Sequence, residues 1–109
     1  MIENSQEEVK KEVEKMLISL GFEPVTVKLE QPTNRGVKEV ECYNREDLFC
    51  RVTFFGLNNT LGEFKNWVLI EYANSLYKAE RWIFEDGDAI PLDIPLEQIL
   101  SELKEEVSR

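Results

Sequence analysis

Residues 66–73, NWVLIEYA, are the stretch that decides how the chain folds. Every side chain in it other than Asn66 and Glu71 is apolar or aromatic, and several are of the β-branched and aromatic types that favour strands. A strand with one wet face alternates polar and apolar residues, whereas a strand covered on both faces is apolar almost throughout. We therefore expect residues 66–73 to form a central strand that is covered on both faces.

Three segments upstream carry further strand patterns. Residues 25–30, VTVKLE, alternate apolar and polar side chains, as in a strand with one buried face. Residues 37–43 and 48–55 are the second and third predicted strands, and the polar residues 44–47 connect them as a hairpin. Because short loops join successive strands, the pattern favours an antiparallel meander.

A helix is predicted over residues 5–20, before the first strand. Its apolar side chains recur at helical spacing, and Ser5 with Glu8 fits a capping box. Gly21 suits the left-handed position that follows a last helical turn.

Two more helices are predicted after the strands. A short helix covers residues 74–82, capped by Asn74 or Ser75. The final helix begins near Asp93, has Pro95 in its first turn and runs to about residue 107.

These elements predict an α+β fold in the order α-β-β-β-β-α-α, with residues 1–109 as a single domain. The first and last helices are amphipathic and need a surface to cover. We expect both to pack on one face of a four-stranded antiparallel meander sheet.

The charge of the chain limits its partners. It has 13 basic and 22 acidic residues, a net charge of −9, and no histidine. Such a surface repels nucleic acid and anionic lipid and favours a basic protein partner. With no apolar run long enough to span a bilayer and no signal peptide at the N-terminus, we expect a cytoplasmic protein that contacts no membrane.

The stretch FEDGDAIPLD, residues 84–93, gathers three acidic residues around a glycine. An EF-hand loop starting at Asp86 would place Ile90 and Pro91 where calcium needs an oxygen ligand and a glycine. The alternative is a turn made by Asp86 and Gly87. The sequence therefore predicts a structural turn with an exposed acidic tip and no metal site.

Cys42 and Cys50 lie on the two strands of the predicted second hairpin. Alternation places both on the inward face, close together, either opposed or diagonal. A disulfide between them is geometrically conceivable, but in a cytosolic protein we predict two reduced, buried thiols. Two cysteines without histidine are also too few for a structural zinc site.

No catalytic or cofactor-binding motif is present in the sequence. The serines have no histidine to activate them, and the five glycines are isolated, so neither a P-loop nor a dinucleotide fingerprint occurs. We therefore expect no enzyme and no cofactor.

Aromatic residues are the usual anchors of protein interfaces. We expect most of the outward candidates to be buried: Tyr43, Phe49, Phe55, Phe64, Trp67, Tyr77 and Trp82.

In size, acidity and element order the chain resembles the immunity proteins that neutralise bacterial toxins and small phage-borne inhibitors. Residues 69–93, LIEYANSLYKAERWIFEDGDAIPLD, also resemble the C-terminal part of uncharacterised small bacterial proteins. The resemblance implies a non-enzymatic domain that docks a basic partner protein. The predicted contact residues are Trp82, Glu85, Asp86 and Asp88.

Two alternatives remain open at this point. The chain could be an accessory or regulatory domain that binds a small ligand between its helices and its sheet. It could also imitate nucleic acid, with rows of carboxylates that occupy the groove of a nuclease.

Overall fold

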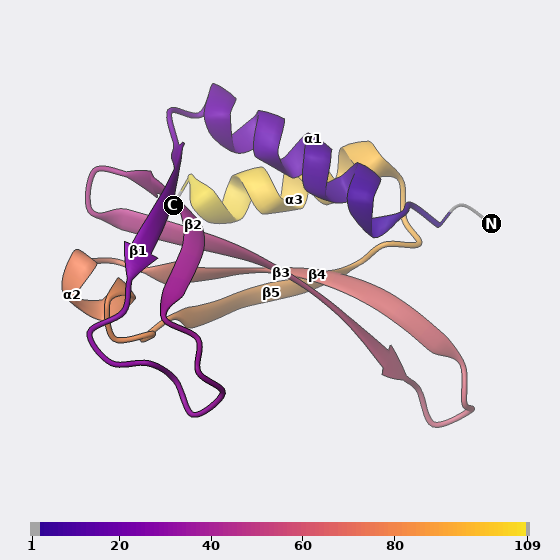
Figure 1. Ribbon diagram of the computed structural model, residues 1–109. Helices are drawn as coiled ribbons and strands as arrows, with labels where there is room; N and C mark the ends of the chain where they lie inside the picture. Colours follow the sequence, from indigo (N-terminus) through magenta and orange to yellow (C-terminus); the bar gives the residue numbers. More distant parts are fainter. Residues whose placement is uncertain (1–2, 109) are drawn as a thin grey trace.

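A computed structural model describes residues 3–108, which form five strands and three helices (Figure 1). The chain runs in the order α1 (Gln6–Ser19), β1 (Glu23–Lys28), β2 (Glu39–Arg45), β3 (Leu48–Asn58), β4 (Phe64–Ala73), α2 (Leu76–Ala79), β5 (Glu85–Pro91) and α3 (Leu96–Val107). All neighbouring strands are antiparallel, in the spatial order β1-β2-β3-β4-β5. The α+β class and the antiparallel meander are confirmed.

The predicted count of four strands is wrong, because residues 85–91 form a fifth. Asp86 and Gly87 make no turn: Asp86 pairs with Glu71 of β4, and the pairing shifts register between Leu69 and Glu71, where β5 has one residue more than β4. Pairing with an adjacent strand outweighs the local turn preference of an Asp-Gly dipeptide.

The first and last helices cover one face of the sheet, as predicted (Figure 1). The stripe of α1 around Val13 and the stripe of α3 around Leu103 are fully buried against the side chains of β3, β4 and β5. The largest core cluster lies between these two layers: Val9, Val13, Leu17, Phe22, Cys50, Val68, Ile70, Ile90, Leu92, Ile99, Leu103 and Val107.

The other face of the sheet has only a small cover. A second cluster lies at the β1–β2 side, where α2 and the segment after it pack on Val40, Cys42 and Phe49. β4 does lie inside the sheet, between β3 and β5, but its second face is buried only at Ala73. The expectation that residues 66–73 are covered on both faces is therefore wrong for most of their length.

The helix ends match the sequence at α1 and differ at α3. The Ser5 hydroxyl accepts a hydrogen bond from the Glu8 N–H at 3.1 Å, and Gly21 has a φ of 91°. Asp93 does not cap α3; it forms an ion pair with Lys65, Nζ to Oδ2 3.2 Å. The chain before α3 is instead held by Asn4, whose side-chain amide donates to the carbonyls of residues 92 and 94.

Cys42 and Cys50 are free and buried, as predicted, but they do not share a face. Tyr43 is the residue directly opposite Cys50, so Cys42 points to the other side of the sheet. The two thiols accordingly belong to the two separate core clusters.

We expect both thiols to react with a thiol reagent at pH 8 only after denaturation. Burial raises the pKa of Cys42 to about 11 and that of Cys50 to about 12, so almost no thiolate is present in the folded protein. Titration of native and urea-unfolded protein checks this. Rapid loss of either thiol in the native protein, or an intramolecular disulfide after mild oxidation, would contradict the placement.

Candidate functional site

The candidate site is the part of the sheet that α1 and α3 leave uncovered, which we call the open face. Strand pairing puts its members on one side of β3, β4 and β5, opposite the helices. Its members are Arg51, Thr53, Phe55, Lys65, Trp67, Leu69, Glu71, Asp86 and Ala89, with Trp82 beside them.

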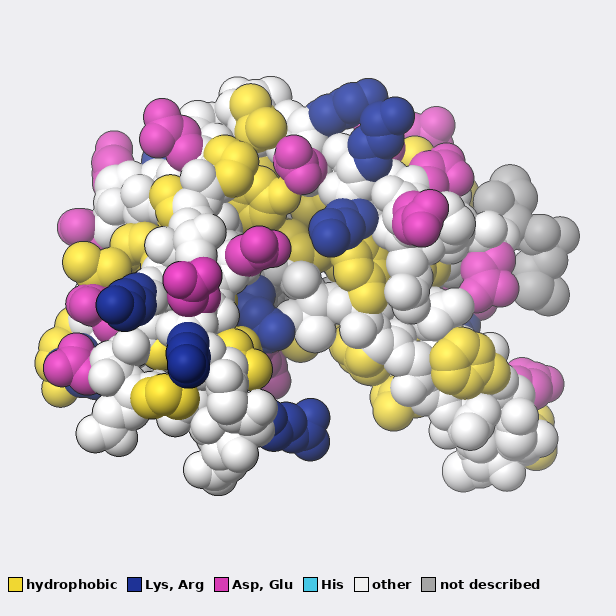
Figure 2. Space-filling view, in the orientation of Figure 1, with side chains coloured by type: hydrophobic (Ala, Val, Ile, Leu, Met, Phe, Trp, Pro, Cys, Tyr) yellow, Lys and Arg dark blue, Asp and Glu magenta, His cyan; other side chains and the backbone are white. Residues whose placement is uncertain are grey.

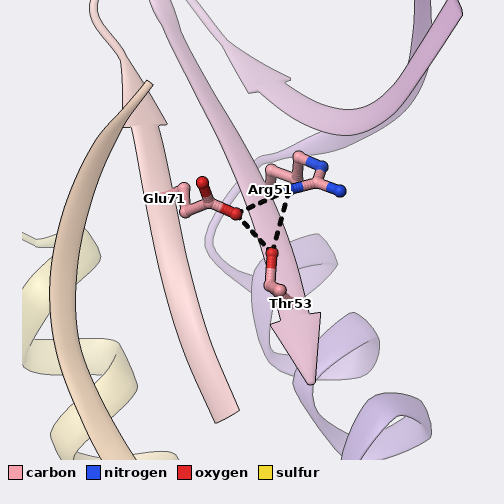
Figure 3. A network of polar contacts seen from close by, with 3 residues as sticks. All are labelled: Arg51, Thr53 and Glu71. Carbon is pink, nitrogen blue, oxygen red and sulfur yellow. Dashed lines mark hydrogen bonds and ion pairs between the residues drawn. The ribbon is translucent and has the colours of Figure 1, made fainter. Parts of the chain in front are cut away.

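A polar network occupies the middle of the open face (Figure 3). Arg51 donates to Glu71, Nη1 to Oε1 2.6 Å, and to the Thr53 hydroxyl at 3.1 Å. The Thr53 hydroxyl in turn donates to the same Glu71 oxygen. The Glu71 side chain is only 14% exposed and that of Arg51 29%, so the pair is more strongly coupled than an exposed ion pair.

Aromatic and apolar side chains continue the open face toward the β3–β4 turn. Phe55 and Trp67 lie opposite each other on paired strands with nearly parallel rings, 6.5 Å between centroids. The Lys65 ammonium lies 5.4 Å from the centroid of the Trp67 ring. The solvent-facing side of a two-layer antiparallel sheet is ordinarily polar, so the partly exposed side chains of Phe55, Trp67 and Leu69 are unusual there.

Trp82 holds an unusual backbone conformation at the edge of this face. α1 and α2 both end with the same pattern of two backbone hydrogen bonds, which requires one residue in the left-handed conformation just after the helix. That residue is Gly21 after α1 and Trp82 after α2. Trp82 has a φ of 55°, which is costly for a bulky residue. The Arg51 guanidinium lies over the Trp82 indole, 4.7 Å from the ring centroid. The indole also packs edge-on against the Phe84 ring.

The four predicted contact residues do not form one acidic tip. Asp86 lies on the open face, directly across from Glu71, and Trp82 lies nearby over Arg51. Glu85 pairs with Tyr72 and therefore faces the helix side, because neighbouring residues of a strand point to opposite faces.

Asp88, the fourth predicted residue, lies in the irregular part of β5 near α3. Its N–H donates to the Glu106 carboxylate, N to Oε1 2.6 Å. Glu106 is buried, and among residues 3–108 its second oxygen has no hydrogen-bond partner. The Glu106 carboxylate thus holds the backbone of β5 at Asp88, within the sheet rather than in an acidic tip.

The geometry of β5 also opposes a calcium loop. An extended strand sends the carboxylates of Asp86 and Glu85 to opposite faces, so they cannot converge on one ion. Across residues 3–108 no three cysteine, aspartate or glutamate side chains gather into a group that could hold a metal. Within residues 3–108 no helix has both the length and the apolar character needed to cross a membrane.

A second feature is a fork in the sheet. The β2–β3 ladder ends at the pair Tyr43–Cys50, after which the two strands diverge. Figure 2 shows the resulting hollow between the lobe of β1 and β2 and the projecting β3–β4 hairpin. At the root of the fork is a pocket of about 430 Å³, whose lining is Lys10, Glu14, Pro24, Val25, Thr26, Glu41, Cys42, Tyr43 and Val52.

The Tyr43 hydroxyl donates to the Glu14 carboxylate at 3.0 Å in this pocket. Burial, then that hydrogen bond and the charges of Glu14 and Glu41, raise the pKa of Tyr43 to about 12. The pocket wall is therefore acidic and hydrogen-bonded at Tyr43 and Glu14, and burial keeps the thiol of Cys42, which also lines it, protonated.

The expectation that most of the seven aromatic candidates are buried is wrong, since among them only Phe49, at 8% exposure, is buried. Phe64 and Tyr77 are more than 60% exposed, and the other four are half-buried. Arg51 and Glu71 were not among the residues that the sequence singled out. Their one signal was a charge in the middle of each of two largely apolar strands, and only the β3–β4 register shows that they are partners.

Comparisons of the chain with models of protein families, with curated proteins and with solved structures found no match.

Proposed function

We propose that the chain is a non-enzymatic binding domain whose open face docks a basic region of a partner protein. This is the mode of action expected of an immunity- or inhibitor-type protein, which blocks its target by occupying a surface. The observation that carries the proposal is the partly exposed aromatic and apolar surface of Phe55, Trp67 and Leu69 on a sheet face that the two long helices do not cover.

The charges on this face support a basic partner. Arg51, Glu71 and Asp86 form a row across three strands, and Arg51 is already paired with Glu71. Asp86 stands opposite Glu71, a like-charged pair that a lysine or arginine of a partner would stabilise. The net charge of −9 adds long-range attraction, which raises the association rate more than the affinity.

The backbone of Trp82 supports the same surface. A bulky residue in the left-handed region costs on the order of 1–3 kcal/mol, and such strain is concentrated at functional sites. Gly21 fills the equivalent position after α1 without that cost. Tryptophan is also among the residue types that contribute most to binding energy at interfaces.

The test uses the two tryptophans of the chain, Trp67 and Trp82, which both lie at the open face. A partner captured on the immobilised protein from a lysate of the source cell is purified and titrated into the free protein. Docking on the open face should change the tryptophan fluorescence with a saturable curve. Binding that leaves the fluorescence of both indoles unchanged would exclude this face.

We expect Asp86→Asn to weaken that binding about threefold to tenfold and to flatten its salt dependence, because it removes one interfacial charge. Glu85→Gln is the matched control: the adjacent residue of the same strand is also exposed and loses the same charge, but it faces the helix side. Surface plasmon resonance at two salt concentrations compares them. Equal effects of the two variants would mean that Asp86 acts only through the net charge of the protein and not through a contact on the open face.

Trp82→Gly should lower the free energy of unfolding by less than about 2 kcal/mol, well below the usual cost of about 3–5 kcal/mol for removing a buried tryptophan. Relief of the left-handed backbone offsets part of the lost packing. The same variant should weaken partner binding at least tenfold. A large loss of stability with unchanged binding would make Trp82 a core residue only.

The pocket at the fork favours a second candidate, the small-ligand domain. Its volume of about 430 Å³ falls within the usual range for ligand sites. Its charged rim of Lys10, Glu14 and Glu41 would suit a polar cation better than an apolar molecule. A thermal-shift screen with small cations, in which a rise in Tm is lost in Glu14→Gln, tests this candidate.

A further inference from the structure

We propose that the inner edge of β3, within the fork, binds an extended basic segment of a partner protein as an added β-strand. The partner is the basic protein of the proposed function, and in that respect the inference rests on it. The surface is a different one: the backbone edge of β3, rather than the side chains of the open face.

The edge exists because β2 covers only the beginning of β3. β4 pairs with β3 from Phe49 to Asn58, along nearly its whole length. On the opposite side the ladder with β2 stops at Cys50. Within residues 3–108 no strand pairs with residues 51–58 of β3 on that side.

The backbone groups that face the fork follow from the alternation of the ladder. The Asn59 N–H donates to the Glu63 carbonyl at the hairpin turn, so the odd-numbered residues of β3 bond to β4. The even-numbered residues point their N–H and C=O groups the other way. Val52, Phe54, Gly56 and Asn58 therefore present a row of donors and acceptors to the fork.

The two outer edges of the sheet differ from this one. The edge of β1 is short and carries Pro24 and charged residues at both ends, and that of β5 carries three acidic residues, Pro91 and an irregular register. Charges, prolines and bulges are the usual features that stop an edge from pairing. Residues 52–58 of β3, VTFFGLN, contain no charge and no proline.

Charge selects the occupant of the fork. Glu14 of α1 and Glu41 of β2 line the pocket at its root, against one ammonium group, that of Lys10. Glu39 lies on the same side of β2 but stands directly opposite Lys28 of β1, which offsets its charge, so the attraction rests on Glu14 and Glu41. A second copy of the chain would bring its own net charge of −9 to this edge, whereas a lysine-rich segment would be attracted.

The test uses a synthetic peptide of four Val-Lys repeats and amide hydrogen exchange followed by NMR. At a peptide concentration tenfold above its Kd, exchange at residues 52, 54, 56 and 58 should slow by about tenfold. The amides of residues 53, 55 and 57 are already bonded to β4 and should not change. A peptide with N-methyl groups along one edge is the control, because it keeps the charge and loses the donors.

Glu41→Gln should weaken the peptide about twofold to fivefold, as expected for one exposed ion pair, and Asp86→Asn should leave it unchanged. The inference is overturned if the N-methylated peptide binds equally well, if protection appears at β1 or β5, or if no binding occurs below about 1 mM. Protection of the even-numbered amides that grows with protein concentration alone would assign the edge to a second copy and overturn it too.

The two proposals fail separately. Peptide binding that depends on Asp86 and changes the tryptophan fluorescence, without protection in β3, would remove the strand edge and keep the open face. Suppose instead that the peptide protects the β3 amides, and that substitutions at Asp86 and Trp82 leave binding of the captured partner unchanged. That result would remove the open face and keep the strand edge.

Discussion

Ile70→Ala should lower the free energy of unfolding by about 2–5 kcal/mol, the range for removing a large aliphatic side chain from a packed core. Ile70 is completely buried and lies in the cluster between the sheet and the two long helices. α1 and α3 are held by that cluster and cannot collapse fully into the space left by three deleted carbons. Urea unfolding followed by circular dichroism measures the change, and the melting temperature should fall by at least about 8 °C.

Leu69→Ala is the matched control, one residue away on the same strand. Leu69 points to the open face and is only half-buried, so the substitution should cost less than about 1.5 kcal/mol. It should, however, weaken partner binding, because it removes apolar surface from the proposed interface. A larger loss of stability in Leu69→Ala than in Ile70→Ala would mean that the two faces of β4 have been assigned the wrong way round.

Gly87→Ala should lower the free energy of unfolding by about 1–3 kcal/mol, since it inserts a methyl group where no space exists. A Cβ at this position would lie 2.7 Å from Oε1 of Glu106 and 2.8 Å from the Ile70 carbonyl oxygen. The carboxylate could rotate away, but the carbonyl belongs to the backbone of β4 and moves only with the strand. Thermal and urea unfolding of the variant check the prediction.

A double-mutant cycle with Glu106→Ala tests the cause. Glu106→Ala alone should destabilise, because the Asp88 N–H loses its acceptor. It also removes two of the three close atoms, so Gly87→Ala should cost less in that background, with a coupling of about 0.5 kcal/mol or more. Additive effects would show that the Ile70 carbonyl alone sets the cost.

Local physical chemistry was enough to determine much of the fold from the sequence. Ser5 and Gly21 mark the ends of α1 because a hydroxyl acceptor and a left-handed backbone satisfy groups that any helix leaves unpaired. Periodicity placed the first four strands within a few residues and both long helices on one side of the sheet. Short loops between strands made the antiparallel meander the natural topology.

Features that depend on register were decided only by the tertiary structure. Two residues, Glu46 and Asp47, connect β2 to β3, so Tyr43 rather than Cys42 shares a face with Cys50. Side chains alternate along a strand, and a difference of one residue in the pairing therefore moves a whole strand pattern to the other face. The sequence predicted the hairpin but not this register.

The candidate site depends on the same kind of information. The acidic stretch forms a strand because β4 offers it a partner. Arg51 contacts Glu71, twenty positions further along the chain, because β3 and β4 pair in one particular register. The apolar pattern of residues 66–73 predicted a strand that the chain covers on both faces, but one of these faces stays partly exposed at Trp67, Leu69 and Glu71. The fold supplies helices for one face only, because both long amphipathic helices pack on the same side and α2, with four residues, reaches only the end of the other.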